Sequence, residues 1–486
     1  MDHREFDVVV LGAGAVGENV ADRARAAGLE VAIVEHELVG GECSYWACVP
    51  SKVLLRSSTV LRAARRVPGA AEAAAGELDV AAVLARRDEW VSDWDDRNGV
   101  AWVESIGVEL VRGHGRLDGE RRVVVTRPDD TEVALVARLA VAVCTGSTPN
   151  VPDIPGLAEA RPWTSREATS ARSAPRRLAV IGGGVVAAEM ASAYAGFGTE
   201  VTVLARTTML GSMEPFAGEA VVAGLRAAGA TVRLGVSPER VDRGDDGRVV
   251  ITLPGGDTID ADEVLVATGR RPRTTGIGLE TVGLEAGAWI DVDDTLAVTK
   301  LADAAADGAA PWLYAVGDVN HRALFTHQGK YQARAAGDVI GARALGRAVD
   351  DARFGIHAAT ADLVAVPSIV FGDPEVATVG LTAAAAEGAG IAVRLAEVPF
   401  SSASGAGILA DGYEGRARLV IDADRGVVVG ATFVGPDTAE LVHAATIAIV
   451  GEVPVDRLWH AVPGFPTLSE IWLRLLESLG RPEADG

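Results

Sequence analysis

A glycine-rich turn that occurs twice, at residues 12–17 and 182–187, is the feature that most constrains how this chain folds. Each copy follows a short apolar segment expected to be a strand and opens an alanine-rich helical segment. Strand, glycine turn and helix in this order are typical of a βαβ dinucleotide-binding unit, in which the helix N-terminus attracts a pyrophosphate. The sequence therefore predicts an α/β fold with two Rossmann-like domains, one for a flavin and one for a nicotinamide, with hydride passing between them.

The first unit has every part of this pattern. Residues 6–11 are expected to form a buried strand, and a second strand over 31–34 ends on Glu35, whose carboxylate can accept hydrogen bonds from ribose hydroxyls. Gly12 permits the tight turn, Gly14 permits the close approach of the backbone to the pyrophosphate, and Gly17 permits close helix–strand packing.

The second unit repeats the pattern with one difference. Strands are expected over 178–181 and 201–204, and the turn and helix start carry three small residues: Gly182, Gly184 and Ala187. No acid ends the second strand, where Ala205 and Arg206 stand instead. Because a guanidinium can pair with a 2′-phosphate that a carboxylate would repel, this site favours NADPH, with NADH as the alternative. The competing interpretation makes Arg206 an ordinary solvated arginine.

The three cysteines divide into a pair and a single residue. Cys144 lies in an apolar segment, 141–145, and is interpreted as a core thiol. Cys43 and Cys48 lack the further partners of a structural zinc site, so no metal site is predicted and a disulfide is the better interpretation. An ideal helix would separate their Cα atoms by at least about 7.5 Å, whereas disulfides need about 7 Å or less. The segment should therefore be only partly helical, and the bond labile and redox-active; two unrelated buried thiols are the alternative.

Composition excludes several other classes of protein. The 486 residues are 23% charged and carry a net charge of −22, which argues against nucleic acid or an anionic membrane as a partner. Three cysteines are too few for a secreted disulfide scaffold, and the N-terminal sequence lacks the features of a signal peptide. With no apolar stretch of about 20 residues, the expectation is a cytoplasmic protein without a membrane span.

The cysteine segment makes a family resemblance recognisable. Cys43-x4-Cys48-Val-Pro-Ser-Lys52 after a glycine turn resembles the pyridine nucleotide-disulfide oxidoreductases, which include dihydrolipoamide dehydrogenase, mercuric reductase and mycothione reductase. Later segments resemble the family's two domain crossovers, its second flavin motif and the start of its dimerisation domain, at 144–156, 266–272, 314–318 and 366–382.

The resemblance implies a domain organisation. An FAD domain is expected over 1–155 and 285–352, with an NAD(P) domain inserted at 156–284. A C-terminal α+β interface domain is expected over 353–486. The family builds each active site from two chains, so a homodimer with a shared active site is implied.

The resemblance also implies roles for individual residues. Cys48 would face the flavin and Cys43 would attack the acceptor. Lys52 and Glu189 would pair near the flavin, although a purely structural ion pair is the alternative. Further cofactor contacts are implied along the chain at Gly41, His114 with Gly115, Thr145, Gly146, Ser147, Gly269, Asp318, Thr326 and His327.

The C-terminal segment departs from the family pattern. The family has His-Pro-Thr-x-x-Glu, and this chain keeps Glu470 but has Phe465 at the histidine position. A phenylalanine can neither stabilise a thiolate nor protonate a departing thiol. His460 is a second candidate if the loop brings it inward, and otherwise a loop or core residue.

Three functions therefore compete. The first passes electrons from NADPH through FAD to the dithiol and on to a disulfide or other small acceptor. In the second, FAD reduces a quinone, another electrophile or a metal ion without needing the thiols. An aromatic mouth of the site would favour this second function, and it would be formed by Tyr45, Trp46, Trp459, Phe465 and Trp472. The competing interpretation is packing at a dimer interface, which is favoured for Trp472, whereas a substrate surface is favoured for Trp46. The third is a non-catalytic flavoprotein subunit of an assembly.

Overall fold

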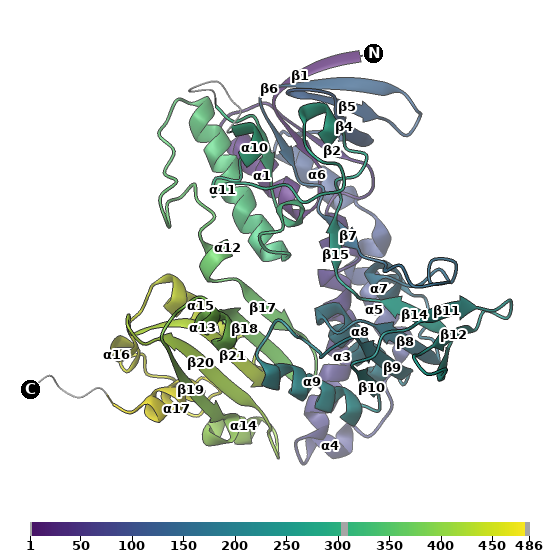
Figure 1. Cartoon of the computed structure of the whole chain (residues 1–486), viewed down its shortest axis with the longest axis vertical. Coiled ribbons are helices and arrows are strands. Elements are labelled where there is room, and N and C mark those ends of the chain that lie inside the picture. The colour runs from purple at the N-terminus through teal and green to yellow at the C-terminus, as the bar shows by residue number, and fades with distance from the viewer. Residues whose placement is uncertain (1, 303–309, 482–486) are drawn as a thin grey trace, which may run out of the picture. The chain divides into compact units, whose positions relative to one another are not determined.

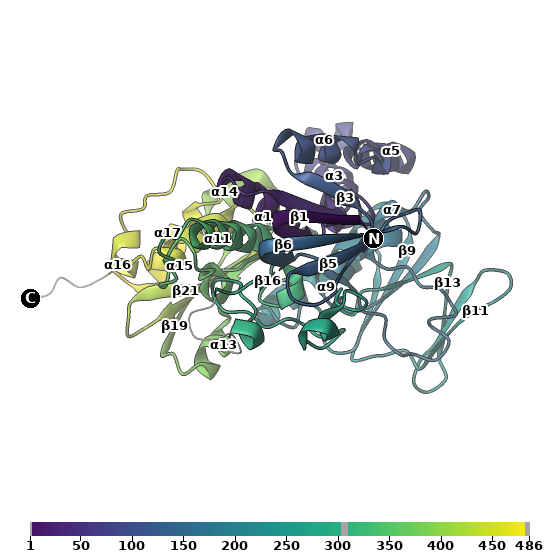
Figure 2. The same ribbon diagram turned by 90° about the horizontal axis from the view of Figure 1, so that it is seen from above.

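The computed structural model describes residues 2–302 and 310–481, and Figures 1 and 2 show its ribbon from two sides. The chain packs into two compact units, each built from three segments. The first unit comprises Met1–Pro50, Asp88–Pro149 and Arg270–Leu363, and the second comprises Ser51–Arg87, Asn150–Gly269 and Val364–Gly486. The three domains expected from the sequence do not coincide with these packing units, and their boundaries stay a prediction.

A seven-stranded sheet organises the first unit, with the order β3-β2-β1-β6-β5-β4 and β16 paired to β6. Its strands are β1 (Asp2–Leu11), β2 (Val31–Glu35), β3 (Glu109–Arg112), β4 (His114–Leu117), β5 (Arg122–Thr126), β6 (Glu132–Val143) and β16 (Leu313–Ala315). Strands β3, β2, β1, β6 and β16 are parallel, whereas β4 and β5 form an antiparallel flap. The apolar run predicted over 6–11 is buried in β1, because parallel strands are covered on both faces.

Two long helices pack together beside this sheet. Helix α1 (Ala15–Ala26) lies along α11 (Thr326–Ala344), which follows from a distant part of the sequence (Figure 1). Glycines on α11 allow the approach: a Cβ at Gly337 would lie 2.5 Å from Arg23 Cβ, and one at Gly341 would lie 2.7 Å from Ala27 Cβ. The other helices that begin in this unit are α2 (Gly41–Tyr45), α3 (Cys48–Arg65), α6 (Arg97–Ser105), α10 (Thr299–Ala302) and α12 (Ala361–Val364), with 3₁₀ turns at Ser92–Trp94, Leu279–Val282 and Asp318–Asn320.

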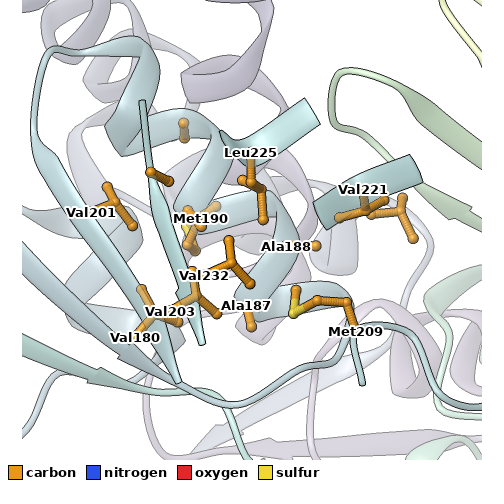
Figure 3. Packing of buried hydrophobic residues seen from close by; sticks show 14 of the residues in the cluster. Val180, Ala187, Ala188, Met190, Val201, Val203, Met209, Val221, Leu225 and Val232 are labelled. Carbon is orange, nitrogen blue, oxygen red and sulfur yellow. The ribbon is translucent and has the colours of Figure 1, made fainter. Parts of the chain in front are cut away.

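The second unit contains a smaller parallel sheet of order β10-β9-β8-β14. Its strands are β8 (Arg177–Ile181), β9 (Glu200–Ala205), β10 (Thr231–Leu234) and β14 (Glu263–Val266), and a three-stranded antiparallel sheet is formed by β11 (Arg240–Arg243), β12 (Val249–Thr252) and β13 (Thr258–Ala261). Helices nearby are α4 (Ala70–Ala73), α5 (Val80–Trp90), α7 (Ser165–Ser170), α8 (Val185–Gly196) and α9 (Pro215–Ala227). Figure 3 shows how Val180 and Val203 of the strands pack against Met190 of α8 in one buried cluster.

The remaining part of the second unit is an α+β layer. Its sheet is antiparallel with the order β17-β18-β21-β20-β19, formed by β17 (Pro367–Val370), β18 (Glu375–Gly380), β19 (Val393–Pro399), β20 (Arg416–Asp422) and β21 (Val427–Gly435). Its helices are α13 (Ala383–Gly388), α14 (Ser404–Leu409), α15 (Leu441–Val450), α16 (Val455–Leu458) and α17 (Glu470–Leu479), with a 3₁₀ turn at Phe400–Ser402. Helices α15 and α17 bury Ala445 and Leu475 in the core of this layer.

Two short strands mark the places where the chain leaves and returns to the first unit. Strand β7 (Ser147–Pro149) pairs antiparallel with β15 (Arg270–Pro272), and the N–H of Asn150 donates to Gly269 O at 2.9 Å. Both segments fall in the stretches that the sequence predicts as crossovers. Among residues 2–302 and 310–481, no helix has the length and apolar character that a membrane span requires.

Candidate active site

The first glycine turn has a geometry that side chains would prevent. Gly12 has φ +99°, and a Cβ on it would lie 2.6 Å from Cys144 O. A Cβ on Gly17 would lie 1.9 Å from Gly12 O, so this glycine is required for α1 to start against the strand. A Cβ on Gly14 would meet only Gly41 Cα, at 3.8 Å. The turn therefore presents open backbone at the N-terminus of a helix, which suits a phosphate group.

Glu35 ends β2 beside this turn. Its Oε2 accepts the N–H of Ala13 at 2.8 Å and its Oε1 accepts the N–H of Glu37 at 2.8 Å. Burial raises the pKa of Glu35, but the His36 side chain and these backbone N–H groups outweigh burial and lower it overall. The Glu35 carboxylate is therefore fixed by two backbone N–H groups at the position expected for a ribose contact.

Two further residues that are expected to contact a cofactor also lie in the first unit. Gly115 lies in β4, where a Cβ would come within 2.8 Å of Leu11 Cδ2, so only glycine fits this close approach. Within residues 2–302 and 310–481, the buried hydroxyl of Thr145 has no hydrogen-bond partner. Thr145 directly follows the buried Cys144, which belongs to the core as expected, although β6 already ends at Val143.

Asp318 is held by residues from both crossovers. Ser147 Oγ donates to Asp318 Oδ2 at 2.5 Å, and Arg270 Nε donates to Ser147 Oγ at 2.6 Å. Arg270 also lies 3.8 Å from Asp318. Beside them Gly146 adopts φ +72° and accepts the N–H of Arg273 at 3.0 Å. The sequence predicted Ser147, Gly146 and Asp318 but missed Arg270, whose position directly after Gly269 in the return crossover was the available signal.

The cysteine pair lies across a break between two helices. Helix α2 ends at Tyr45 and α3 begins at Cys48, which confirms that the segment is only partly helical. Both cysteines are free thiols in this structure, so the disulfide between them stays a prediction. The hydrogen bond from Cys48 and burial raise the pKa of Cys43, while Thr326 and Lys330 act in the opposite direction.

Helix α11 begins at these thiols. Cys48 Sγ lies 3.2 Å from Thr326 Oγ1, so the first residue of α11 contacts the cysteine expected to face a flavin. The next residue, His327, stacks on Phe325 with ring centroids 5.3 Å apart. On the other side Glu42, which precedes Cys43, pairs with Arg273 at 3.2 Å.

The expected pair of Lys52 and Glu189 is formed in the second unit. Lys52 Nζ donates to Glu189 Oε2 at 2.8 Å, and the N–H of Phe371 donates to Glu189 Oε1 at 3.1 Å. The Lys52 ammonium also lies 5.0 Å from the centroid of the Phe371 ring. The contribution of Phe371 was not visible in the sequence, because it depends on a strand far along the chain.

The second glycine turn also excludes side chains. Gly182 has φ +140° and a Cβ there would lie 2.2 Å from Ala267 O, while one on Gly183 would lie 2.6 Å from Thr208 O. Gly184 faces open space, and Ala187 is buried in α8. Arg206 follows β9 and is exposed, with no hydrogen bond or ion pair within the part of the chain that the structure describes.

The C-terminal candidates are not brought together. Glu470 is 3% exposed; its Oε2 accepts the N–H of Gly405 at 3.1 Å, and its Oε1 lies 3.7 Å from Arg474. His460 is exposed, and its imidazole makes no hydrogen bond or ion pair with any described residue. Phe465 is 76% exposed. Trp472 packs on Phe433 with ring centroids 5.8 Å apart, as expected for a packing residue.

Comparison with protein families accounts for this combination of sites. A model described as pyridine nucleotide-disulphide oxidoreductase matches residues 6–337, and the dimerisation-domain model of the same family matches residues 366–475. The chain belongs to the pyridine nucleotide-disulphide oxidoreductase family. The predicted fold class, two dinucleotide-binding domains followed by a dimerisation domain, and the prediction of an oxidoreductase are thereby confirmed, and members of the family use FAD and NAD(P)H.

Individual relatives cover almost the whole chain. A mercuric reductase of Acidithiobacillus ferrooxidans is 33% identical over 468 residues, which is 94% of this chain and 79% of the relative. A dihydrolipoyl dehydrogenase of Chlorobaculum tepidum is 32% identical over 473 residues, 96% of this chain and 95% of the relative. The fold is shared with the HOCl-induced flavoprotein disulfide reductase RclA of Escherichia coli, with a TM-score of 0.81, 22% identity and coverage of 98% and 99%. LpdA of Mycobacterium tuberculosis gives a TM-score of 0.80, 24% identity and coverage of 99% and 100%.

Proposed function

We propose that this chain is an NADPH-preferring FAD enzyme whose Cys43–Cys48 pair carries two electrons to a small acceptor, such as a disulfide. The observation that carries the proposal is the contact between Cys48 and Thr326, in the unit that also holds Cys43 and the first glycine turn. When bound, FAD accepts hydride from the nicotinamide and returns the electron pair to the disulfide.

The residues that would hold FAD all lie in the first unit. The turn of Gly12, Gly14 and Gly17 would face the pyrophosphate, with Gly41 packed against Gly14. Glu35 would accept hydrogen bonds from ribose hydroxyls. The Asp318 carboxylate, which accepts a hydrogen bond from Ser147, would bind the ribityl chain. The unpartnered hydroxyl of Thr145 supports the assignment, since a buried polar group without a partner is costly.

The preference for NADPH rests on Arg206. Its guanidinium is exposed at the end of β9 and is not committed to any described carboxylate, so it is free to pair with a 2′-phosphate. No acid stands at this position to favour the ribose of NADH. Gly182 and Gly184 would turn the backbone toward the pyrophosphate of the same nucleotide.

The thiols have separate roles in this proposal. Cys48, in contact with Thr326, would receive the electrons, and Cys43 would attack the acceptor. Lys52 and Glu189, fixed by Phe371, would set the charge near the reactive edge of the flavin. The same proposal includes three domains, with boundaries near 155, 285 and 353, and a homodimer with a shared active site. The match to the dimerisation-domain model supports the homodimer.

A quinone that takes electrons directly from the flavin is the second candidate. Phe465, 76% exposed, stands where the family supplies a histidine, so the base that serves disulfide exchange is absent at that position. An aromatic side chain offers instead a stacking surface for a flat acceptor. A thiophilic metal ion is a further acceptor that needs no proton for its leaving group, and a mercuric reductase is among the relatives.

An acceptor screen on matched variants tests the proposal. NADPH oxidation is followed with an aromatic disulfide, a benzoquinone and Hg(II), for the wild type, Cys43→Ser and the bystander control Cys144→Ala. The proposal expects Cys43→Ser to lose disulfide turnover and Cys144→Ala to keep it. Full disulfide turnover in Cys43→Ser would contradict the proposal, whereas quinone turnover that survives in this variant would establish direct transfer from the flavin.

A gain-of-function variant tests the role of the missing base. Phe465→His restores the family histidine beside Glu470 in the sequence, and disulfide turnover is expected to rise by about tenfold or more. Phe465→Leu is the matched control, because it removes the aromatic ring without adding a base. Equal turnover in the two variants would show that the missing histidine does not limit this enzyme.

A further inference from the structure

The 3₁₀ turn that carries Asp318 is held by a buried side chain of α11. Gly317, which directly precedes Asp318, has φ +83° and ψ −151°, a conformation that other residues rarely adopt. Its N–H donates to Gln332 Oε1 at 2.8 Å. The same oxygen accepts a side-chain N–H of Asn320 at 2.8 Å. One fully buried amide oxygen therefore contacts both ends of the turn.

The nitrogen of this amide is fixed by a second buried side chain. Gln332 Nε2 donates to Asp362 Oδ2 at 2.9 Å, and the Asp362 side chain is not exposed to solvent. This contact decides which way the amide points. If the amide turned over, its NH₂ group would face the N–H donors of Gly317 and Asn320, and its oxygen would face a carboxylate. Asp362 therefore keeps the Gln332 oxygen directed at the Gly317 N–H.

Asp362, on α12, is itself fixed by two further donors. Gln328 Nε2 donates to Asp362 Oδ1 at 2.8 Å, and Arg322 Nε donates to Oδ2 at 3.2 Å. Burial raises the pKa of Asp362, and Arg322 with the two amides opposes this rise. Arg322 also pairs with the more exposed Asp294 at 2.7 Å. A buried carboxylate needs such charge and hydrogen-bond compensation, and here these contacts also fix Asp362 where it meets Gln332.

We propose that Gln332 and Asp362 are positioning residues for Asp318, the carboxylate expected to bind the ribityl chain of FAD. Asp362 directs the Gln332 amide, and this amide fixes the backbone that leads into Asp318. Ser147 fixes the Asp318 carboxylate itself, at 2.5 Å. The inference rests on the proposed function for the placement of FAD at Asp318, and it does not depend on the thiols.

Loss of either positioning residue should weaken the binding of FAD. Gln332→Met keeps the length of the side chain but removes the acceptor of the buried Gly317 N–H. Asp362→Leu leaves the Gln332 nitrogen without its carboxylate and keeps water out of the space. Each variant is expected to raise the dissociation constant of FAD by about tenfold. The constant is measured by quenching of flavin fluorescence when FAD is added to the full-length, FAD-free chain.

A rescue variant separates positioning from general destabilisation. Gln332→Glu combined with Asp362→Leu presents a carboxylate oxygen to the Gly317 N–H whichever way the side chain turns, so it needs no partner to direct it. This double variant is expected to bind FAD within about threefold of the wild type. Gln328→Glu combined with Asp362→Leu is the matched control, because it also returns one carboxylate to the cluster but leaves the Gln332 amide undirected. It is expected to bind FAD as weakly as Asp362→Leu alone.

Three further outcomes would overturn the inference. The first is unchanged FAD affinity in both Gln332→Met and Asp362→Leu; if Asp362→Leu does not fold, Gln332→Met alone decides. The second is equal recovery in the two double variants, which would mean that any carboxylate in the cluster suffices. The third is a tenfold loss in Asp294→Asn, which removes the exposed partner of Arg322 and is expected to stay within about twofold of the wild type.

Asp318→Asn distinguishes failure of this inference from failure of the proposed function. This variant changes the carboxylate expected to bind FAD, and its dissociation constant for FAD should rise by about tenfold or more. Unchanged affinity in Asp318→Asn would overturn the placement of FAD in the proposed function. Weaker binding in Asp318→Asn together with unchanged binding in Gln332→Met and Asp362→Leu would overturn the positioning roles alone.

Discussion

Lys52 donates to the carboxylate of Glu189 at 2.8 Å, and the two partners differ greatly in exposure. Glu189 is 3% exposed, whereas the Lys52 side chain is 36% exposed. Removal of the lysine would leave a buried carboxylate with only the Phe371 N–H as a partner, whereas removal of the carboxylate charge would leave an ammonium that water can reach.

Substitution of this pair should therefore have asymmetric effects on stability. Lys52→Met is expected to lower the free energy of unfolding by about 2–3 kcal/mol, and Glu189→Gln by about 1 kcal/mol or less. Denaturant midpoints from circular dichroism measure both. Equal losses in the two variants would show that the burial of Glu189 does not decide how much each partner contributes to the free energy of unfolding.

Thr326→Val should reduce the amount of thiolate in the reduced enzyme. The variant removes the hydroxyl 3.2 Å from Cys48 Sγ, and a hydrogen bond to a charged group contributes about 1.5–3 kcal/mol, or about tenfold or more in the thiolate population. The ultraviolet absorbance of the thiolate against pH gives the measurement. Thr326→Ser keeps the hydroxyl and should behave as the wild type, and a loss in that control would point to packing of the methyl group instead.

Gly14 and Gly17 of the first turn should respond differently to alanine. A Cβ on Gly17 lies 1.9 Å from Gly12 O, so Gly17→Ala is expected to destabilise the fold by about 3 kcal/mol. Gly14 has φ −75° and room for a methyl group, so Gly14→Ala should cost less than about 1 kcal/mol in the FAD-free chain. Gly14→Ala should nevertheless lose FAD, measured as the ratio of flavin to protein absorbance; full retention would place the pyrophosphate elsewhere.

Arg206→Ala should change the choice of nicotinamide. Loss of a charge-assisted contact to the 2′-phosphate is expected to lower kcat/KM for NADPH by about tenfold to a hundredfold and to leave NADH unchanged. Steady-state rates with both nucleotides provide the test, with Arg248→Ala as a control for loss of an exposed arginine. An equal effect on NADH and NADPH would remove Arg206 from the nucleotide site.

Glu18 should make stability depend on pH. Its pKa in the folded chain, about 7, lies above the ordinary 4.5, so the folded state binds more protons than the unfolded state between these values. Stability should then fall as the pH rises from 4.5 to about 7. Glu18→Gln is expected to be more stable than the wild type by about 1–2 kcal/mol near pH 8, with no gain near pH 4. Denaturant unfolding of both proteins at pH 4 and pH 8 measures the difference in stability. An equal gain at both pH values would mean that ionisation of Glu18 is not the cause.

Local backbone geometry was the part of the structure that the sequence predicted well. The glycines at 12, 17 and 182 occupy positions where any Cβ would collide with backbone, so their residue type reports the turn directly. The helix break between Cys43 and Cys48 was expected from an assumed disulfide, because a continuous helix would space those residues too widely for one; the break is present although both thiols are free.

Contacts between distant charged residues could not be predicted. Glu18 and Lys330 carry no local pattern that links them, and the charge of Lys330 acts on Glu18 only because α1 packs on α11. Arg270 is similar, since its hydrogen bond to Ser147 depends on the pairing of β7 with β15. His460 was a candidate because of its residue type, but only the structure of its loop shows that it is exposed.

The β7–β15 pairing has a consequence for how such a chain could have been assembled. Because Pro149 lies opposite Arg270, the segment between them, 150–269, leaves and returns through one narrow hairpin stem. A two-residue turn is enough to close an antiparallel stem of this kind. The two ends of segment 150–269 therefore meet at one strand pair, which is the geometry that lets a segment be inserted into a shorter chain. The β7–β15 pair is thus a site at which this segment can be exchanged for another one.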